Sequence, residues 1–143
     1  MARVKIELPE KFVFQTEIPI RISDLNYGGH LGNDSVLSIV HEARVRFLQS
    51  LGFSEKNVDG PGIIMVDAAL QYKSEGFYGD VIKIEIGIGD ITNTGCDIIY
   101  RLSNIESNKL IAIVKTGIVF FDYDKRKVTT IPNIFLSKLL RAD

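Results

Sequence analysis

The sequence predicts an α+β domain in which one long helix packs against an antiparallel sheet. The helix is indicated by apolar residues that recur every three or four positions between residues 36 and 51. The sheet is indicated by four strand-like segments that follow one another after residue 62 without another long helix between them. Because successive strands pair most simply as an antiparallel sheet, we expect this sheet to wrap around the helix. With 143 residues, the chain has the length of one domain, 1–143.

The individual elements follow from local patterns. A first strand is expected at 13–22, where apolar residues alternate with polar ones. The long helix is expected at 34–51, with Asn33 as N-cap, Asp34 in the favourable first turn and Gly52 as its stop. Further strands are expected at 63–72, 80–91, 95–103 and 109–123, and the run 110–114 is apolar enough to be buried on both faces. A short helix at 133–141 follows Pro132.

Composition excludes several classes of function. The 17 Lys and Arg residues nearly balance the 18 Asp and Glu residues, so no basic surface for nucleic acid or an anionic membrane is expected. No apolar run reaches the ~18 residues of a membrane-spanning helix. The single Cys96 allows neither an intramolecular disulfide nor a cysteine-based zinc site. Together with a first segment that lacks a secretory pattern, this cysteine usage predicts a cytoplasmic protein.

The residues with the strongest chemical potential lie between the first strand and the long helix. Segment 23–34 contains three of the 12 glycines and brings together Asp24, Asn26 and His30. The segment ends at the start of a helix, whose free N–H groups can stabilise negative charge. Acyl transfer needs such donors for the oxyanion and an acid or base beside them. Alternatively, the same residues form an ordinary turn, in which Asn33 only caps the helix.

Other candidates outside this segment are weaker. His41 follows Leu37 by one helical turn, and we expect it to be solvated or at an interface. The two histidines are eleven positions apart and one lies within the helix, so no metal site is predicted. Asp67 interrupts an apolar strand and either faces a cleft or lies at the strand's edge. The basic turn 125–127 is either a solvated hairpin tip or a binding site for the phosphate groups of a carrier. Motifs of serine hydrolases and nucleotide enzymes are absent, and no cofactor is predicted.

Several short segments occur in the order and spacing of a known family. They are Arg21-Ile-Ser-Asp24-Leu-Asn26-Tyr-Gly-Gly29-His30-Leu-Gly-Asn33, Val40-His-Glu42-Ala-Arg44, Leu70-Gln-Tyr72-Lys73, Tyr78-Gly79-Asp80, Lys115-Thr116-Gly-Ile-Val119-Phe-Phe-Asp122 and Ile131-Pro132. Over nearly its whole length, the chain thereby resembles a hot-dog-fold acyl-CoA thioesterase of the 4-hydroxybenzoyl-CoA thioesterase type. The resemblance implies a curved antiparallel sheet around one central helix, and homodimers or homotetramers with active sites between subunits. It also implies hydrolysis of an acyl thioester of CoA or of an acyl carrier protein.

The resemblance also implies roles for residues of the loop. In much of the family an Asp four residues before the His is the nucleophile or general base, and that position is Asn26 here. We therefore expect Asp24 or His30 to activate water and Asn26 to position it. The backbone N–H of Asn33 falls where relatives polarise the thioester carbonyl. Further contacts to the substrate are expected from Tyr27, Gly29, Asp67 and Lys73.

Two other functions remain open at this point. The loop also resembles that of (R)-specific enoyl-CoA hydratases, but Tyr27 replaces a Pro and one extra residue precedes His30. This longer spacing and the helix segment Glu42-Ala-Arg44 favour the thioesterase. Because a neutral amide at Asn26 can neither attack a thioester nor deprotonate water, a domain that binds an acyl-CoA or acyl carrier protein without cleaving it is the third interpretation.

Overall fold

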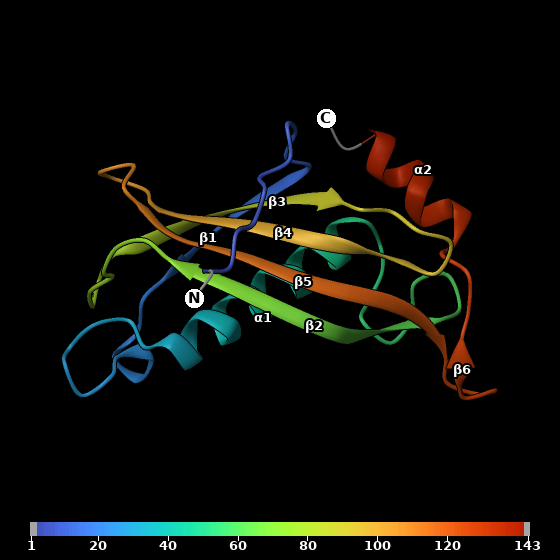
Figure 1. The fold of residues 1–143 in the computed structure, drawn as a ribbon, viewed down its shortest axis with the longest axis horizontal. Coiled ribbons are helices and arrows are strands. Elements are labelled where there is room, and N and C mark those ends of the chain that lie inside the picture. The colour runs from blue at the N-terminus through green and yellow to red at the C-terminus, as the bar shows by residue number, and fades with distance from the viewer. Residues whose placement is uncertain (1–2, 142–143) are drawn as a thin grey trace.

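In the computed structural model, which describes residues 3–141, a six-stranded antiparallel sheet lies over one long helix (Figure 1). The strands are β1 (Phe14–Pro19), β2 (Gly62–Tyr72), β3 (Val81–Gly89), β4 (Gly95–Asn104), β5 (Leu110–Asp122) and β6 (Lys127–Val128). Their order in the sheet is β1-β3-β4-β5-β2, with β6 paired to β5. The helices are α1 (Asn33–Ser50) and α2 (Asn133–Arg141), with a short 3-10 turn, η1 (Ile22–Asp24), before α1. The predicted α+β architecture, a sheet around a helix, is confirmed.

Alternation along the strands builds the core between the sheet and α1. On β3, Ile82, Ile84 and Ile86 are fully buried, whereas Lys83 and Glu85 between them are partly exposed. Burial of this apolar face is the main stabilising contribution. On β5, residues 111–114 are all buried, as the apolar run predicted. Part of the sheet's other face is covered by the first residues of the chain, where the side-chain amide of Gln71 bonds to the backbone of Val4 and Ile6.

The start of α1 differs from the expectation. Asn33 is not the N-cap: it is the first helical residue, and Gly32 takes the N-cap position without a side-chain cap. The side-chain oxygen of Asn33 instead accepts a hydrogen bond from the Asp34 N–H at 3.0 Å. The predicted stop is confirmed, because α1 ends at Ser50 and Gly52 adopts a φ of 85° that favours glycine.

The first strand is shorter than predicted. It ends at Pro19 rather than near residue 22, although the Ile20 N–H still bonds to the carbonyl of Asp80. Beyond it, residues 22–24 turn into η1 because the Asp24 carboxylate accepts the backbone N–H of Arg21 at 2.8 Å. This turn directs the chain into the loop before α1. No helix within residues 3–141 is long and apolar enough to cross a membrane.

Candidate active site

The loop between η1 and α1 closes on itself through its backbone. Leu25 and Leu31 form an isolated antiparallel bridge, and the Asn26 N–H donates to the carbonyl of His30 at 2.8 Å. The side-chain oxygen of Asn26 accepts the N–H groups of Gly28 at 2.9 Å and His30 at 3.3 Å. The tip of the loop, with Tyr27, is fully exposed. The Asn26 oxygen therefore holds the loop, while its NH₂ group has no partner within residues 3–141 and stays available.

Asp24 lies beneath this loop rather than on its surface. It is only 3% exposed, and its carboxylate accepts hydrogen bonds from the backbone and the guanidinium of Arg21. Its backbone carbonyl accepts the N–H of Gly32 at 2.9 Å, at the start of α1. The structure thus gives Asp24 a role in tying the two ends of the loop together. Activation of water by its carboxylate stays a prediction.

His30 is held by the turn between β2 and β3. Its Nδ1 lies 3.2 Å from Oε1 of Glu75, and its ring meets Phe77 edge-on with 5.2 Å between centroids. The neighbouring Leu31 N–H bonds to the carbonyl of Gly76. If Nδ1 carries the proton that Glu75 accepts, Nε2 of His30 is left as an acceptor, and nothing in the described part of the chain occupies it.

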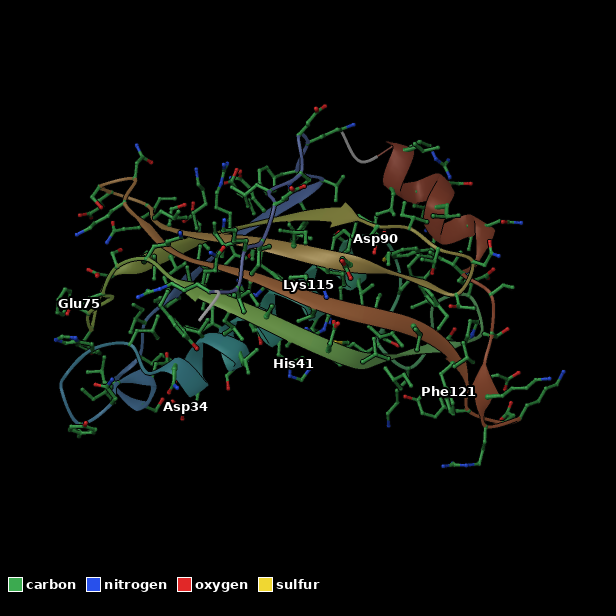
Figure 2. The ribbon with its side chains drawn as sticks, in the orientation of Figure 1. Asp34, His41, Glu75, Asp90, Lys115 and Phe121 are labelled. Atoms are coloured by element: carbon green, nitrogen blue, oxygen red, sulfur yellow. The ribbon has the colours of Figure 1, made fainter. Side chains whose placement is uncertain are left out.

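The first N–H groups of α1 face this loop. The N–H of Asn33 has no acceptor among residues 3–141, as expected of the first residue of a helix, and Asn33 itself is exposed. Figure 2 shows Asp34, at the start of α1, and Glu75, the partner of His30, at the same end of the molecule. Within residues 3–141, this end of the molecule therefore combines a backbone N–H without an acceptor, a group of the kind that can stabilise an oxyanion, with a histidine nitrogen that has no partner.

The predicted contacts on β2 lie apart from this loop. Asp67 is at an irregularity of β2, where its carboxylate accepts Nζ of Lys115 at 2.8 Å and the N–H of Gly117 at 3.1 Å. The hydrogen bond from Lys115 is the main reason why the pKa of Asp67 lies below its ordinary value. Lys73 follows β2 with an exposed side chain. The structure thus places Asn26, Tyr27, Gly29 and His30 in the loop, with Asp24 at the end of η1 before it and Asn33 at the start of α1 after it. Asp67 lies on β2 and Lys73 just after that strand.

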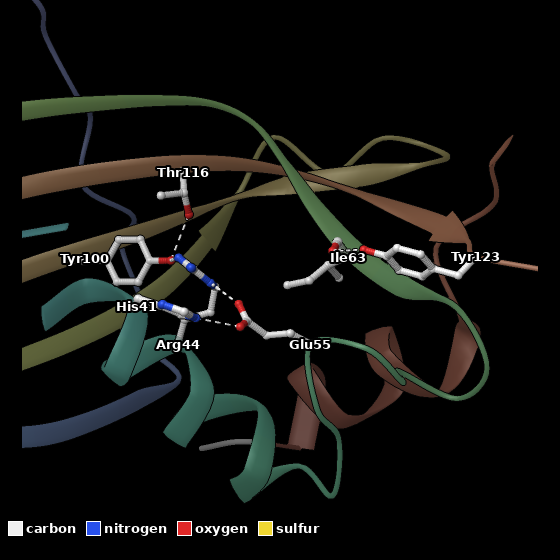
Figure 3. A network of polar contacts seen from close by, with 7 residues as sticks. All are labelled: His41, Arg44, Glu55, Ile63, Tyr100, Thr116 and Tyr123. Atoms are coloured by element: carbon white, nitrogen blue, oxygen red, sulfur yellow. Dashed lines mark hydrogen bonds and ion pairs between the residues drawn. The ribbon is translucent and has the colours of Figure 1, made fainter. Parts of the chain in front are cut away.

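A second polar cluster was not anticipated from the sequence, and we call it the Arg44 network. The nearly buried Arg44 of α1 donates to Glu55 at 2.7 Å and to the hydroxyl of Tyr100 at 3.1 Å (Figure 3). That hydroxyl lies 2.8 Å from Oγ1 of Thr116, and the other oxygen of Glu55 lies 2.8 Å from Nε2 of His41. These contacts link β4, β5, α1 and the segment after α1. His41 is partly exposed, as expected, but it is also anchored.

Burial and pairing fix the charges in the Arg44 network. Burial acts to lower the pKa of Arg44, but the contacts with Tyr100 and Glu55 outweigh it and raise that pKa. Partial burial acts to raise the pKa of Glu55, but hydrogen bonds from Arg44 and His41 hold it below its ordinary value. Burial raises the pKa of Tyr100, which keeps the phenol protonated. The network therefore holds one ion pair, between the buried Arg44 and the partly exposed Glu55, with its buried polar neighbours satisfied.

An open hollow of about 370 Å³ lies beside this network. Its walls come from α1 and from strands β2 and β5, and they comprise Leu37, Ser38, His41, Arg44, Met65, Ala68 and Thr116. Leu37 and Met65 are about two-fifths exposed, with relative accessibilities of 42% and 40%. An apolar rim of this kind suits an apolar ligand group. Helical spacing places Leu37, Ser38 and His41 on the same face of α1 as Asp34.

The order of the elements and the helix inside a curved sheet define a hot-dog fold, and solved structures agree. The 1,4-dihydroxy-2-naphthoyl-CoA thioesterase from Synechocystis is similar with a TM-score of 0.80 and 22% identity, over 89% of this chain and 95% of that one. The DHNA-CoA thioesterase from Staphylococcus aureus gives 0.75 and 20%, over 90% and 86%. A further Staphylococcus aureus protein, solved in complex with CoA, gives 0.82 and 16%, over 96% and 87%.

The sequence gives a family assignment as well. A family model described as the thioesterase-like superfamily matches residues 20–139. The match spans most of the chain and includes both the loop and the Arg44 network. The chain therefore belongs to the thioesterase-like superfamily. A comparison with curated proteins gave no significant match.

Proposed function

We propose that the protein hydrolyses an acyl thioester of CoA or of an acyl carrier protein to a free acid and a thiol. The observation that carries the proposal is that the first N–H of α1, at Asn33, and Nε2 of His30, three residues before it, both lack a partner among residues 3–141. Membership in the thioesterase-like superfamily supports this class of reaction. The resemblance to the 4-hydroxybenzoyl-CoA thioesterase type and the thioesterase names of two structural neighbours support an acyl-CoA substrate.

In this proposal the thioester carbonyl accepts the N–H of Asn33, which stabilises the oxyanion as it forms. Nε2 of His30 accepts a hydrogen bond from the attacking water, and the NH₂ group of Asn26 orients the carbonyl or the water. Removal of an oxyanion donor typically costs about 10²–10³ in rate, and loss of an acid or base about 10²–10⁴. The proton of the water goes either to His30 or to a carboxylate outside the family's usual position, because Asn26 cannot take it.

The apolar hollow beside α1 supports a place for the acyl group. It lies on the face of α1 that continues from the loop, one to two turns beyond Asn33. At about 1.5 Å per residue, Leu37 and Ser38 are roughly 6–8 Å along the helix from the oxyanion donor. Tyr27, Gly29 and Lys73 are proposed contacts for the carrier part of the substrate. The resemblance implies a homodimer or homotetramer, which light scattering on the purified protein would measure.

The second candidate is a domain that binds acyl-CoA without cleaving it. Two observations favour it: Asn26 replaces the usual acid, and the Asp24 carboxylate is buried against Arg21. Release of free thiol from short, long and aromatic acyl-CoAs and from acyl carrier protein separates the two functions. Turnover of any member is expected. No turnover together with tight binding of a non-hydrolysable CoA thioether would instead establish the binding domain.

A further inference from the structure

The loop lacks a carboxylate at the position of Asn26, but a second carboxylate lies close to it in space. A Cβ added to Gly32 would lie 2.7 Å from Oδ1 of Asp34 and 3.6 Å from Cβ of Asn26. Both side chains therefore adjoin the same small space in front of Gly32. That space exists because the N-cap of α1 is a glycine, which provides no side-chain cap.

Asp34 is also free to react. It is exposed, and its carboxylate forms no hydrogen bond or ion pair with residues 3–141. The other acids around the loop are engaged: Asp24 accepts bonds from Arg21, and Glu75 lies against Nδ1 of His30. Among the three acids Asp24, Asp34 and Glu75 around this loop, Asp34 is thus the one whose oxygens are left for a water or a substrate.

We propose that Asp34 is the general base of the thioester hydrolysis proposed above and takes the place in space of the missing acid at Asn26. The assignment rests on that proposed function. A water held by Nε2 of His30 gives one proton to the Asp34 carboxylate as its oxygen bonds to the carbonyl carbon. The N–H of Asn33 stabilises the resulting oxyanion. When the oxyanion collapses, the C–S bond breaks and the sulfur takes the proton from Asp34, which leaves a free acid, a thiol and the ionised base.

A carboxylate in the first turn of a helix also interacts favourably with the helix dipole. A purely structural Asp34 would contribute to stability, and its loss would not be repaired by an acid elsewhere. A catalytic Asp34 makes a different prediction, because a carboxylate at residue 26 would adjoin the same space. The role of the carboxylate can therefore be tested by moving it from residue 34 to residue 26, and not only by removing it.

The test compares kcat and KM of the full chain and its variants on an acyl-CoA that the wild-type protein hydrolyses. Asp34→Asn is expected to lower kcat by about 10²–10⁴ with a small change in KM. When Asn26→Asp is introduced into the Asp34→Asn variant, kcat is expected to rise at least tenfold above that of Asp34→Asn alone. Asp59→Asn, an exposed acid outside the loop where φ is 56° and Asn is well tolerated, is the matched control and should leave kcat unchanged.

Two results would overturn the assignment: full kcat in Asp34→Asn, or a loss that Asn26→Asp does not restore. If Asp34→Asn does not fold, Asp34→Ser replaces it in both comparisons, since serine is well tolerated at a helix start. Absence of turnover in the wild-type protein across the substrate panel would contradict the proposed function and this assignment with it. Retained activity in Asp34→Asn would contradict the assignment alone.

Discussion

The loop before α1 and the Arg44 network both contain a histidine near a carboxylate, but they differ in how fully their groups are paired. In the network, Arg44, Glu55, Tyr100 and Thr116 satisfy one another, and no buried side-chain nitrogen or oxygen of residues 3–141 lacks a partner. Where the loop meets α1, the Asn33 N–H and the Asp34 carboxylate have no partner among those residues.

This difference separates structural from chemical roles. A buried ion pair whose hydrogen bonds are complete has little left to offer a substrate, and its value lies in specifying one arrangement. Groups that stay unpaired at the surface of a loop cost little there and can bind a reacting atom. We therefore assign chemistry to the loop, and to the Arg44 network the task of fixing α1 and the wall of the hollow.

The largest difference between the two regions is expected when each histidine is replaced in turn by alanine. His30→Ala is expected to lower kcat by about 10²-fold or more, because the attacking water loses its acceptor, while stability changes little. His41→Ala should leave kcat nearly unchanged, with any effect in KM, because its ring lines the hollow. Steady-state thiol release measures both. Equal losses of kcat in the two variants would refute the distinction between the regions.

Breaking the buried pair should affect folding instead. Arg44→Met removes one donor from the Glu55 carboxylate, which keeps His41, and one from the buried Tyr100 hydroxyl, which keeps Thr116. Because Glu55 is partly exposed, the expected cost is about 2–3 kcal/mol, below the range for a fully buried pair. Urea unfolding followed by circular dichroism gives the change in the free energy of unfolding. The kcat of the fraction that remains folded should stay close to the wild-type value. A stability loss below about 1 kcal/mol would show that the network is not the anchor proposed here.

A smaller effect is expected from pH. Hydrogen bonds from Arg44 and His41 hold the pKa of Glu55 below its ordinary value of 4.5 in the folded chain. The carboxylate of Glu55 therefore binds a proton more readily in the unfolded chain than in the folded one. Its contribution to stability is present above pH 4.5 and is lost as the pH falls through the pKa of the folded state. Glu55→Gln should be less stable near neutral pH but lose less stability on acidification. Parallel pH profiles of the urea midpoint in both proteins would contradict this.

Much of the fold followed from periodicity, and the errors have local causes. The apolar positions of α1 and the alternating isoleucines of β3 predicted the helix and the wrapped sheet. The end of β1 was predicted near residue 22 but lies at Pro19, because a hydrogen bond from the Arg21 N–H to the Asp24 carboxylate stabilises η1 directly after it. The N-cap of α1 was predicted one residue too late because Asn33 is a better cap by residue type than Gly32. In the structure Gly32 takes the cap position, and Oδ1 of Asp34 lies where a side chain on Gly32 would begin.

The site was only partly readable for a similar reason. The loop concentrates its polar residues within a dozen positions, so the sequence alone located it. The Arg44 network joins a helix, two strands and Glu55 from an irregular segment eleven residues beyond Arg44, and no spacing rule connects them. Asp34 had an ordinary structural explanation in the first turn of a helix. Its proximity to Asn26 depends on the path of the loop, which local patterns do not specify.

We propose that the loop, and not the Arg44 network, carries out thioester hydrolysis. The most direct measurement is thiol release from an acyl-CoA panel by wild-type protein, His30→Ala and His41→Ala at matched folded concentration. We expect turnover to fall by about 10²-fold or more in His30→Ala and to persist in His41→Ala. Turnover that persists in His30→Ala and disappears in His41→Ala would contradict it.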